Sequence, residues 1–275
     1  AGWMMINQGA ADAAAEEGVN LVSVGPAFQG DLSSQLEVFE NLVAQGAAAI
    51  AIAPVDSAGI APAVNDAMGA GIPVVAVDTG VAGAAVTSFV ATDNYAVAKV
   101  QGAVAATLIE DGQPIIYVTG NQAQSTGQER MNGFMEAFSA ARPNSEILQV
   151  PTEWNSQEAQ EGVEAILNSR QDIAMVANAW DGGTMGAKAA LENLGFGAGD
   201  VKLVGFDGAG DAIAAMDDGW VHVDTAQMLY QMGYQGIKAA AAAARGEDVS
   251  ARIDTGFFLV VPATSGVYKE MVGIE

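Results

Sequence analysis

The sequence predicts an α/β protein with two doubly wound parallel-sheet lobes joined by a multi-strand hinge. Two segments carry this prediction, because Ile72–Asp78 and Val201–Asp207 are apolar runs that follow Gly-punctuated helical patterns and stop at an aspartate. A buried parallel strand that ends in this way places a carboxylate at the sheet edge where open α/β sheets bind ligands. The chain of 275 residues also exceeds the usual size of one domain, so two lobes with separate cores are expected.

Helical and strand-like patterns alternate along the chain. Apolar residues at three- and four-residue spacing predict helices over 3–17, 31–45, 58–70, 94–110, 125–141, 156–169, 181–194 and 227–245. Short apolar or extended runs predict strands over 21–24, 48–53, 73–77, 115–118, 147–150, 173–177, 203–206, 221–225 and 257–261. This alternation favours parallel sheets with right-handed crossovers.

The chain changes lobe more than once. We expect residues 1–92 and 228–256 to form the N-terminal lobe, and residues 93–227 and 257–275 to form the C-terminal lobe. Several connections between lobes predict a hinge with a restricted motion. A doubly wound lobe begins with a central strand, whereas a helical pattern opens this chain, so we expect the first strand to be missing from the sequence.

The composition excludes several functions. The 33 acidic and 10 basic residues give a net charge of −23, which repels phosphate backbones, so no nucleic-acid partner is expected. The absence of cysteine and the single histidine, His222, exclude thiolate chemistry and a multi-histidine metal site. No apolar run reaches the roughly 18 residues that a membrane span needs. No export signal is visible, although a mature exported protein has already lost its signal.

Catalytic and nucleotide-binding signatures are missing. The sequence has no Gly-x-Ser-x-Gly elbow, no Gly-x-x-x-x-Gly-Lys loop and no Gly-x-Gly-x-x-Gly turn. The glycines of 195–199 precede a strand and are interpreted as a helix terminator. Asp93 and Asn94 are interpreted as caps of the following helix, and His222 as a structural residue. No cofactor or metal is expected.

Polar and aromatic residues at the predicted strand-to-helix junctions suggest a carbohydrate site. Asp78 and Asp207 can accept hydrogen bonds from vicinal hydroxyls, and Arg130 can donate to the same hydroxyls. Trp154 and Trp180 follow apolar runs, where an indole can stack on a sugar ring. Structural alternatives remain open, because the aspartates can cap helices, the arginine can pair at the surface and the indoles can fill a core.

Several motifs stand in the order in which a known family has them. They are Ile52–Asp56, Ile72–Asp78, Ala91–Asn94, Gln128–Phe134, Trp180–Asp181, Val204–Gly208 and Ala226–Gln227. The chain resembles the ribose-binding-protein-like periplasmic sugar-binding proteins of bacterial ABC importers, a fold shared with the core of LacI-type repressors. The resemblance covers essentially all of the chain.

The resemblance implies a sugar ring held between Trp3 of the first lobe and Trp154 of the second. It places hydroxyl-binding residues, a hinge-adjacent contact and further pocket positions at Asp78, Thr92, Asn121, Arg130, Trp180, Asp207 and Gln227. The chain departs from ribose binders at Ala53 and Thr79, where they have Asn and Arg, and at Trp180, where they have Asn. Fewer polar partners favour another pentose, a deoxy or methylated sugar, or a polyol.

The leading hypothesis is therefore a non-enzymatic receptor, periplasmic or otherwise extracytoplasmic, that delivers a monosaccharide or polyol to an ABC-type permease. We expect a monomer. The effector-binding core of a LacI-type regulator is the alternative, although the chain shows no helix-turn-helix and no basic face. A glycoside-cleaving enzyme using Asp78 and Asp207 as acid and base is a third possibility.

Overall fold

The computed structural model describes residues 2–27 and 30–274. The chain divides into two compact units, each described below by itself. Unit 1 comprises the chain up to Asp93 together with Ala123–Thr126 and Met228–Gly256. Unit 2 comprises Asn94–Gln122, Gly127–Gln227 and the chain from Phe257 onward.

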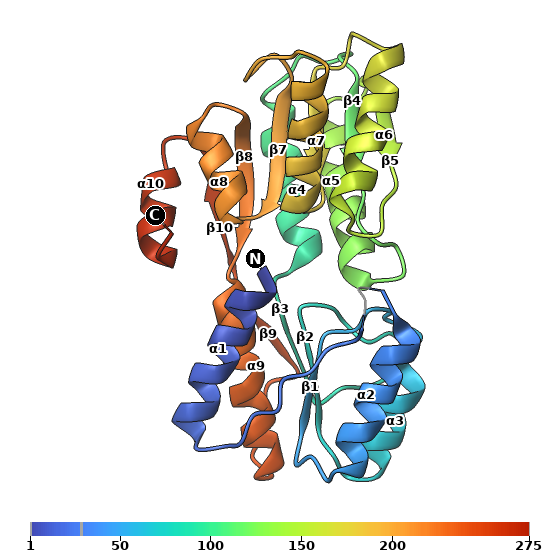
Figure 1. Ribbon diagram of the computed structural model, residues 1–275, viewed down its shortest axis with the longest axis vertical. Coiled ribbons are helices and arrows are strands. Elements are labelled where there is room, and N and C mark those ends of the chain that lie inside the picture. Colours follow the sequence, from blue (N-terminus) through green and yellow to red (C-terminus); the bar gives the residue numbers. More distant parts are fainter. Residues whose placement is uncertain (1, 28–29, 275) are drawn as a thin grey trace. The chain divides into compact units, whose positions relative to one another are not determined.

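Unit 1 is built on a four-stranded parallel sheet with strand order β1-β2-β3-β9. Its strands are β1 (Ile50–Ile52), β2 (Val74–Val77), β3 (Ser88–Ala91) and β9 (Arg252–Asp254). Its helices are α1 (Gly2–Glu17), α2 (Leu32–Ala44), α3 (Ala61–Gly69) and α9 (Leu229–Ala244). Helices α1 and α9 lie side by side on one face of the sheet, and α2 and α3 cover the other (Figure 1).

Alternation along β2 separates the two cores of unit 1. Val75 and Val77 join the cluster under α1 and α9, whereas Val74 joins the cluster under α2 and α3.

Two glycines let the backbones of α1 and α9 come into contact. A Cβ atom on Gly9 would lie 2.0 Å from the Tyr230 carbonyl oxygen, and one on Gly233 would lie 1.8 Å from the Ile6 carbonyl oxygen.

The predicted strand over 21–24 is wrong. The segment is irregular, and Val22 and Val24 are 53% and 55% exposed. The apolar pattern at 21–24 has no neighbouring strand among the described residues, and a strand without hydrogen-bonded neighbours is not stable. The expected strand before residue 1 lies outside the described residues.

Unit 2 is built on a six-stranded sheet with strand order β10-β8-β7-β6-β4-β5. Its strands are β4 (Ile115–Val118), β5 (Ile147–Val150), β6 (Met175–Asn178), β7 (Lys202–Asp207), β8 (Val221–Gln227) and β10 (Phe257–Val260). All neighbouring strands are parallel except β10, which runs antiparallel to β8. The observed sheets are therefore mainly parallel, as predicted, with one antiparallel edge.

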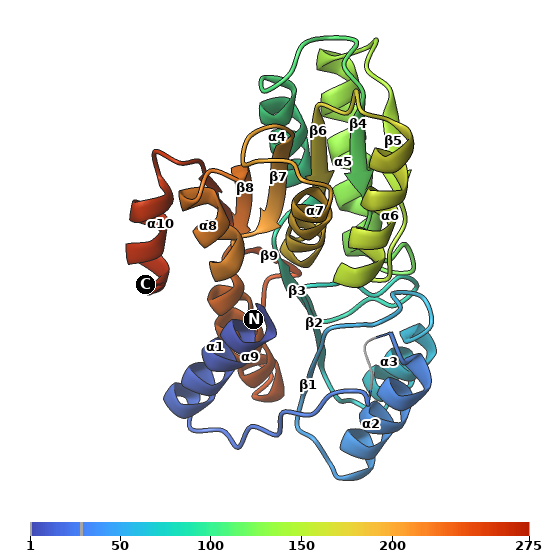
Figure 2. The same cartoon turned by 45° about the horizontal axis from the view of Figure 1, so that its top comes forward.

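Helices cover both faces of the sheet in unit 2 (Figure 2). They are α4 (Asn94–Ala106), α5 (Ser125–Ala141), α6 (Ser156–Ser169), α7 (Asp181–Asn193), α8 (Gly210–Asp217) and α10 (Ser265–Val272). Tyr117 of β4 stacks on Phe134 of α5, and Phe134 stacks on Phe138, with ring centroids 4.6 and 5.4 Å apart. Burial of these rings contributes to the driving force for the fold of this unit.

Helices α8 and α10 were not predicted, because each spans only 8 residues and carries a short apolar pattern. Gly195 follows α7 with a φ of 82°, which confirms that the glycines at 195–199 terminate a helix. Among residues 2–27 and 30–274, none of the helices combines the length and the apolar character that a membrane span requires.

Candidate functional site

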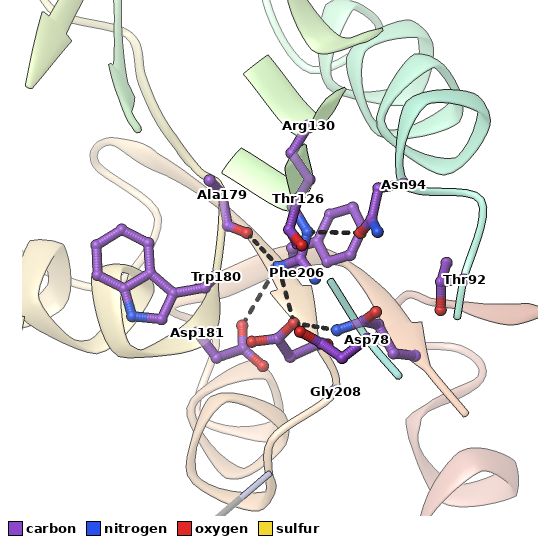
Figure 3. Close-up of polar contacts among 12 residues, drawn as sticks. Asp78, Thr92, Asn94, Thr126, Arg130, Ala179, Trp180, Asp181, Phe206 and Gly208 are labelled. Atoms are coloured by element: carbon purple, nitrogen blue, oxygen red, sulfur yellow. Dashed lines mark hydrogen bonds and ion pairs between the residues drawn. The ribbon is translucent and has the colours of Figure 1, made fainter. Parts of the chain in front are cut away.

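Arg130 of α5 is the centre of a polar arrangement in unit 2 (Figure 3). Its Nε donates to Asn94 Oδ1 at 2.8 Å, and its Nη1 donates to the Ala179 carbonyl at 2.7 Å and to Asp207 Oδ1 at 3.0 Å. The Arg130 side chain is only 3% exposed. A buried guanidinium is costly unless it is paired, and these three acceptors fix its plane and direction.

Asp207 ends β7 and carries the carboxylate that pairs with this guanidinium. Its Oδ1 also accepts a hydrogen bond of 2.7 Å from Gln227 Nε2, at the end of the neighbouring strand β8. The Asp207 side chain retains 24% exposure, so the paired carboxylate is still accessible. The structure therefore brings together three of the residues that the sequence analysis selected: Arg130, Asp207 and Gln227.

Backbone strain gathers at the predicted site residues. Among the described residues, the non-glycine residues with positive φ are Asp78 at 64°, Trp154 at 59° and Asp207 at 120°. Each of them follows or ends a strand, β2, β5 and β7 respectively. Such conformations cost on the order of 1–3 kcal/mol each and tend to persist at functional sites.

Trp154 and Trp180 form an edge-to-face pair in unit 2. Their ring centroids are 5.3 Å apart with an interplanar angle of 86°. Trp180 is only 8% exposed and packs in the core, so it supports the half-buried Trp154. Gly120 provides the space for Trp154, because a Cβ atom there would lie 1.9 Å from the indole Cη2. The guanidinium carbon of Arg130 lies 5.7 Å from the Trp154 ring centroid.

Asn121 follows β4 in unit 2 and is buried. Its carbonyl oxygen would lie 2.1 Å from a Cβ atom at Gly127, so the chain turns back closely on itself here. This turn leads from the carboxyl end of β4 into the start of α5. Asn121 therefore lies at the carboxyl-terminal edge of the sheet, where ligands of open α/β sheets bind.

The predicted residues of unit 1 are Trp3, Asp78 and Thr92. Asp78 follows β2 and accepts a hydrogen bond of 2.8 Å from Thr79 Oγ1, which also lies 2.7 Å from Thr126 Oγ1. Thr92 follows β3 and is fully buried, with its Oγ1 3.4 Å from the Gly256 carbonyl oxygen. Trp3 lies in the first turn of α1 and is 53% exposed.

Three polar residues of this region were not selected as site residues from the sequence. Asn94, which begins α4 and was interpreted as a helix cap, also accepts a hydrogen bond from Arg130. Asp181 and Asp224 are buried next to Asp207 and were not selected. A signal for Asp224 existed, because an aspartate in the middle of a predicted strand is rarely buried without a partner.

Burial raises the pKa of both Asp181 and Asp224. Desolvation, reinforced by the negative charge of Asp224, holds the pKa of Asp181 well above its ordinary value. Desolvation, reinforced by the nearby negative charge of Asp207, raises the pKa of Asp224 to about 7. His222 accepts a hydrogen bond from the Leu203 backbone at 3.4 Å, and burial lowers its pKa, as expected for a structural histidine.

Comparison with known proteins identifies the class of molecule. The chain is 30% identical over 259 residues to the ribose import binding protein of Escherichia coli, covering 94% of this chain and 86% of that protein. An ABC transporter solute-binding protein from Mycobacterium smegmatis, solved with glycerol, is 30% identical with a TM-score of 0.88, covering 97% of this chain and 91% of that one. A carbohydrate transporter solute-binding protein from Agrobacterium radiobacter, in complex with D-arabinose, is 25% identical with a TM-score of 0.91, covering 98% and 94%.

The fold and these similarities define a solute-binding protein of the ABC transporter class. Residues 1–248 match the family described as the periplasmic binding protein domain, and the chain belongs to this family. The resemblance and the fold class predicted from the sequence are both confirmed. The relatives are transport binding proteins and not enzymes, which confirms the predicted non-enzymatic class.

Proposed function

We propose that this protein captures a monosaccharide or polyol and presents it to the membrane permease of an ABC importer. The sugar-binding class follows from relatives whose own names give ribose, D-allose and D-arabinose as their sugars. The observation that carries the proposal is the fixed arrangement of Arg130, Asp207 and Gln227. A guanidinium and a carboxylate held side by side can donate to and accept from vicinal hydroxyl groups of one sugar ring.

Each of the other proposed contacts has a chemical role. Trp154 supplies an indole face for the C–H face of the ring, and Asn94 orients the Arg130 guanidinium. We propose that Asp78 and Trp3 of unit 1 contact the sugar, and that Thr92, which is fully buried, has a supporting role and makes no direct contact with it. A sugar shifts the protein toward one conformation only if it binds that conformation more tightly than the other, and a transport receptor needs such a shift in order to signal occupancy.

The chemistry of the site also limits the sugar. Trp180 is packed against Trp154 and occupies a position where ribose binders have an amide, and Ala53 and Thr79 replace two further polar groups. A site binds best the ligand whose hydroxyl groups all find hydrogen-bond partners in it. With these polar side chains replaced, a pentose other than ribose, a deoxy or methylated sugar, or a polyol fits the site best.

We further propose a periplasmic or extracytoplasmic location, a monomeric state and no interaction with nucleic acid. The net charge of −23 supports the last of these, because it opposes approach to a phosphate backbone. A permease is the partner that a receptor of this family requires.

A thermal-shift screen of the purified protein tests the proposal. A sugar that binds only the folded protein raises its melting temperature. We expect a shift with one member of a panel of pentoses, hexoses, 6-deoxy sugars and polyols, and its loss in Asp207→Asn. The exposed Asp218→Asn variant, which changes the net charge equally, should keep the shift. No shift with any sugar would contradict the proposal.

A further inference from the structure

Two buried carboxyl groups lie next to β7, the strand that ends at Asp207. Asp181 opens α7 and Asp224 lies in β8, and the two residues are 2% and 0% exposed. Gly205 of β7 is the register partner of Asp224. A Cβ atom on Gly205 would lie 2.5 Å from Asp224 Oδ2 and 2.6 Å from Asp181 Oδ1. Glycine at this position therefore leaves the space in which the carboxyl groups meet.

Asp181 Oδ1 and Asp224 Oδ2 both border the space beside Gly205, so the two carboxyl groups are neighbours there. Ionised carboxylates only accept hydrogen bonds, so a hydrogen bond between two carboxyl groups requires a proton on one of them. Asp224 Oδ1 accepts from the Gly208 backbone N–H at 3.0 Å. Its Oδ2 has no hydrogen-bond partner among the described side chains and backbone groups, so a proton held between Oδ2 and Asp181 would satisfy this buried atom.

The charges around the pair favour keeping this proton. The groups that face it are Asp207 from β7, Arg130 from α5 and the Tyr268 hydroxyl from α10. With both carboxyls ionised, a single guanidinium would face three negative charges in a water-poor region, which is costly. Within the described part of the chain, no group of three or more His, Asp or Glu side chains is arranged to hold a metal ion instead.

Asp181 and Asp224 accept backbone hydrogen bonds from the turn around Asp207. The Phe206 N–H donates to Asp181 Oδ1 at 3.2 Å, and the Ala209 N–H donates to Asp181 Oδ2 at 2.7 Å. The Gly208 N–H donates to Asp224. Asp207 lies between these donors with its strained φ of 120°, and such a conformation persists only where its surroundings impose it.

We propose that Asp181 and Asp224 share one proton and act as positioning residues, holding Asp207 in the conformation that binds the sugar. When the pair loses this proton, the two adjacent negative charges repel each other. The carboxyl groups then move apart, and their hydrogen bonds to the turn at 206–209 weaken. The affinity for sugar then falls as the pH rises above neutrality. This inference rests on the proposed role of Asp207 in binding the sugar.

Calorimetric titration with D-ribose, D-allose and D-arabinose tests the proposal at about pH 6 and about pH 8.5. For a sugar that binds at about pH 6, we expect the affinity of the wild type to fall roughly tenfold at the higher pH. The affinity of the Asp224→Asn variant should differ by less than about twofold between the two pH values, because the amide that replaces the carboxyl group donates to Asp181 at every pH. The exposed Asp218→Asn should behave like the wild type. Equal affinity of the wild type at both pH values, or the same fall in Asp224→Asn, overturns the proposal.

An infrared measurement without sugar separates this proposal from the proposed function. The difference spectrum between the wild type and Asp224→Asn should show the C=O band of a protonated carboxylic acid at about pH 6, lost at about pH 8.5. If none of the three sugars binds but this band is present, these three sugars are not ligands of the protein and the shared proton stands. A spectrum without the band at about pH 6 excludes the shared proton even if a sugar binds.

Discussion

The guanidinium carbon of Arg130 lies 3.9 Å from the centroid of the Phe206 ring. Phe206 precedes Asp207 in β7, so one strand end supplies both the flat surface against which the guanidinium stacks and the carboxylate with which it pairs. This arrangement suits a planar group with several donors, and a lysine ammonium cannot reproduce it.

Arg130→Lys should therefore lose most of the affinity for sugar. The ammonium would give up the stacking and the three fixed hydrogen bonds, and we expect a loss of about 2–4 kcal/mol, roughly 30- to 1,000-fold in affinity. Calorimetric titration with the sugar measures this loss of affinity. Arg170→Lys, which changes an arginine in ion pairs with Glu146 and Asp172, serves as the control. An unchanged affinity in Arg130→Lys would exclude Arg130 from the site.

Trp154→Ala should weaken sugar binding strongly. Removing the indole deletes the stacking face, and we expect a loss of about 1–3 kcal/mol in binding free energy. Trp220→Ala, which removes a partly buried indole beside Lys188, should leave the affinity within about twofold. The two variants are compared by titration calorimetry, and equal affinities for them would refute the role of Trp154.

Asp224→Asn should change how stability depends on pH. The pKa of Asp224 rises from 3.8 to about 7 on folding, so between these values the folded protein holds a proton that the unfolded chain has lost. The contribution of Asp224 to stability therefore falls by up to about 4 kcal/mol as the pH rises from about 4 to about 7, and it is constant above about pH 7. Urea unfolding at several pH values should show this fall in the difference in stability between the wild type and the variant. Parallel curves for the two proteins would contradict the raised pKa.

Gly233→Ala should destabilise unit 1. A methyl group there would meet the Ile6 carbonyl at 1.8 Å, so α1 and α9 must separate, and we expect a loss of about 2 kcal/mol or more. Gly69→Ala in α3 is the matched control, because a Cβ atom there meets nothing within 4 Å. That variant should be neutral or slightly more stable. Thermal unfolding compares them, and equal melting temperatures would show that the helices do not pack at Gly233.

Much of the fold followed from the sequence because parallel strands are buried on both faces and appear as continuous apolar runs. The strands ending at Val77 and Asp207 are examples. The run at 21–24 is also mainly apolar but has no hydrogen-bonded neighbouring strand among residues 2–27 and 30–274, and a strand depends on that neighbour as much as on its own residues.

The site was harder to predict than the fold. Asp207 and Arg130 were selected because charged groups at a strand end or helix start are visible in the sequence. Asp181 and Asp224 were not, because their pairing depends on the space that Gly205 leaves between two strands and a helix. The role of Asn94 depends on Arg130, which is 36 residues away in the chain.

The left-handed backbone at Asp78, Trp154 and Asp207 has a consequence for how such a protein diverges. At roughly 1–3 kcal/mol each, the three conformations together cost about 3–9 kcal/mol, a large amount beside the folding stability of a typical domain, about 5–15 kcal/mol. Glycine at any of them would relax the chain. A descendant that no longer needs its sugar should therefore acquire glycine at these positions early, and their identity offers a molecular record of whether selection for binding still acts.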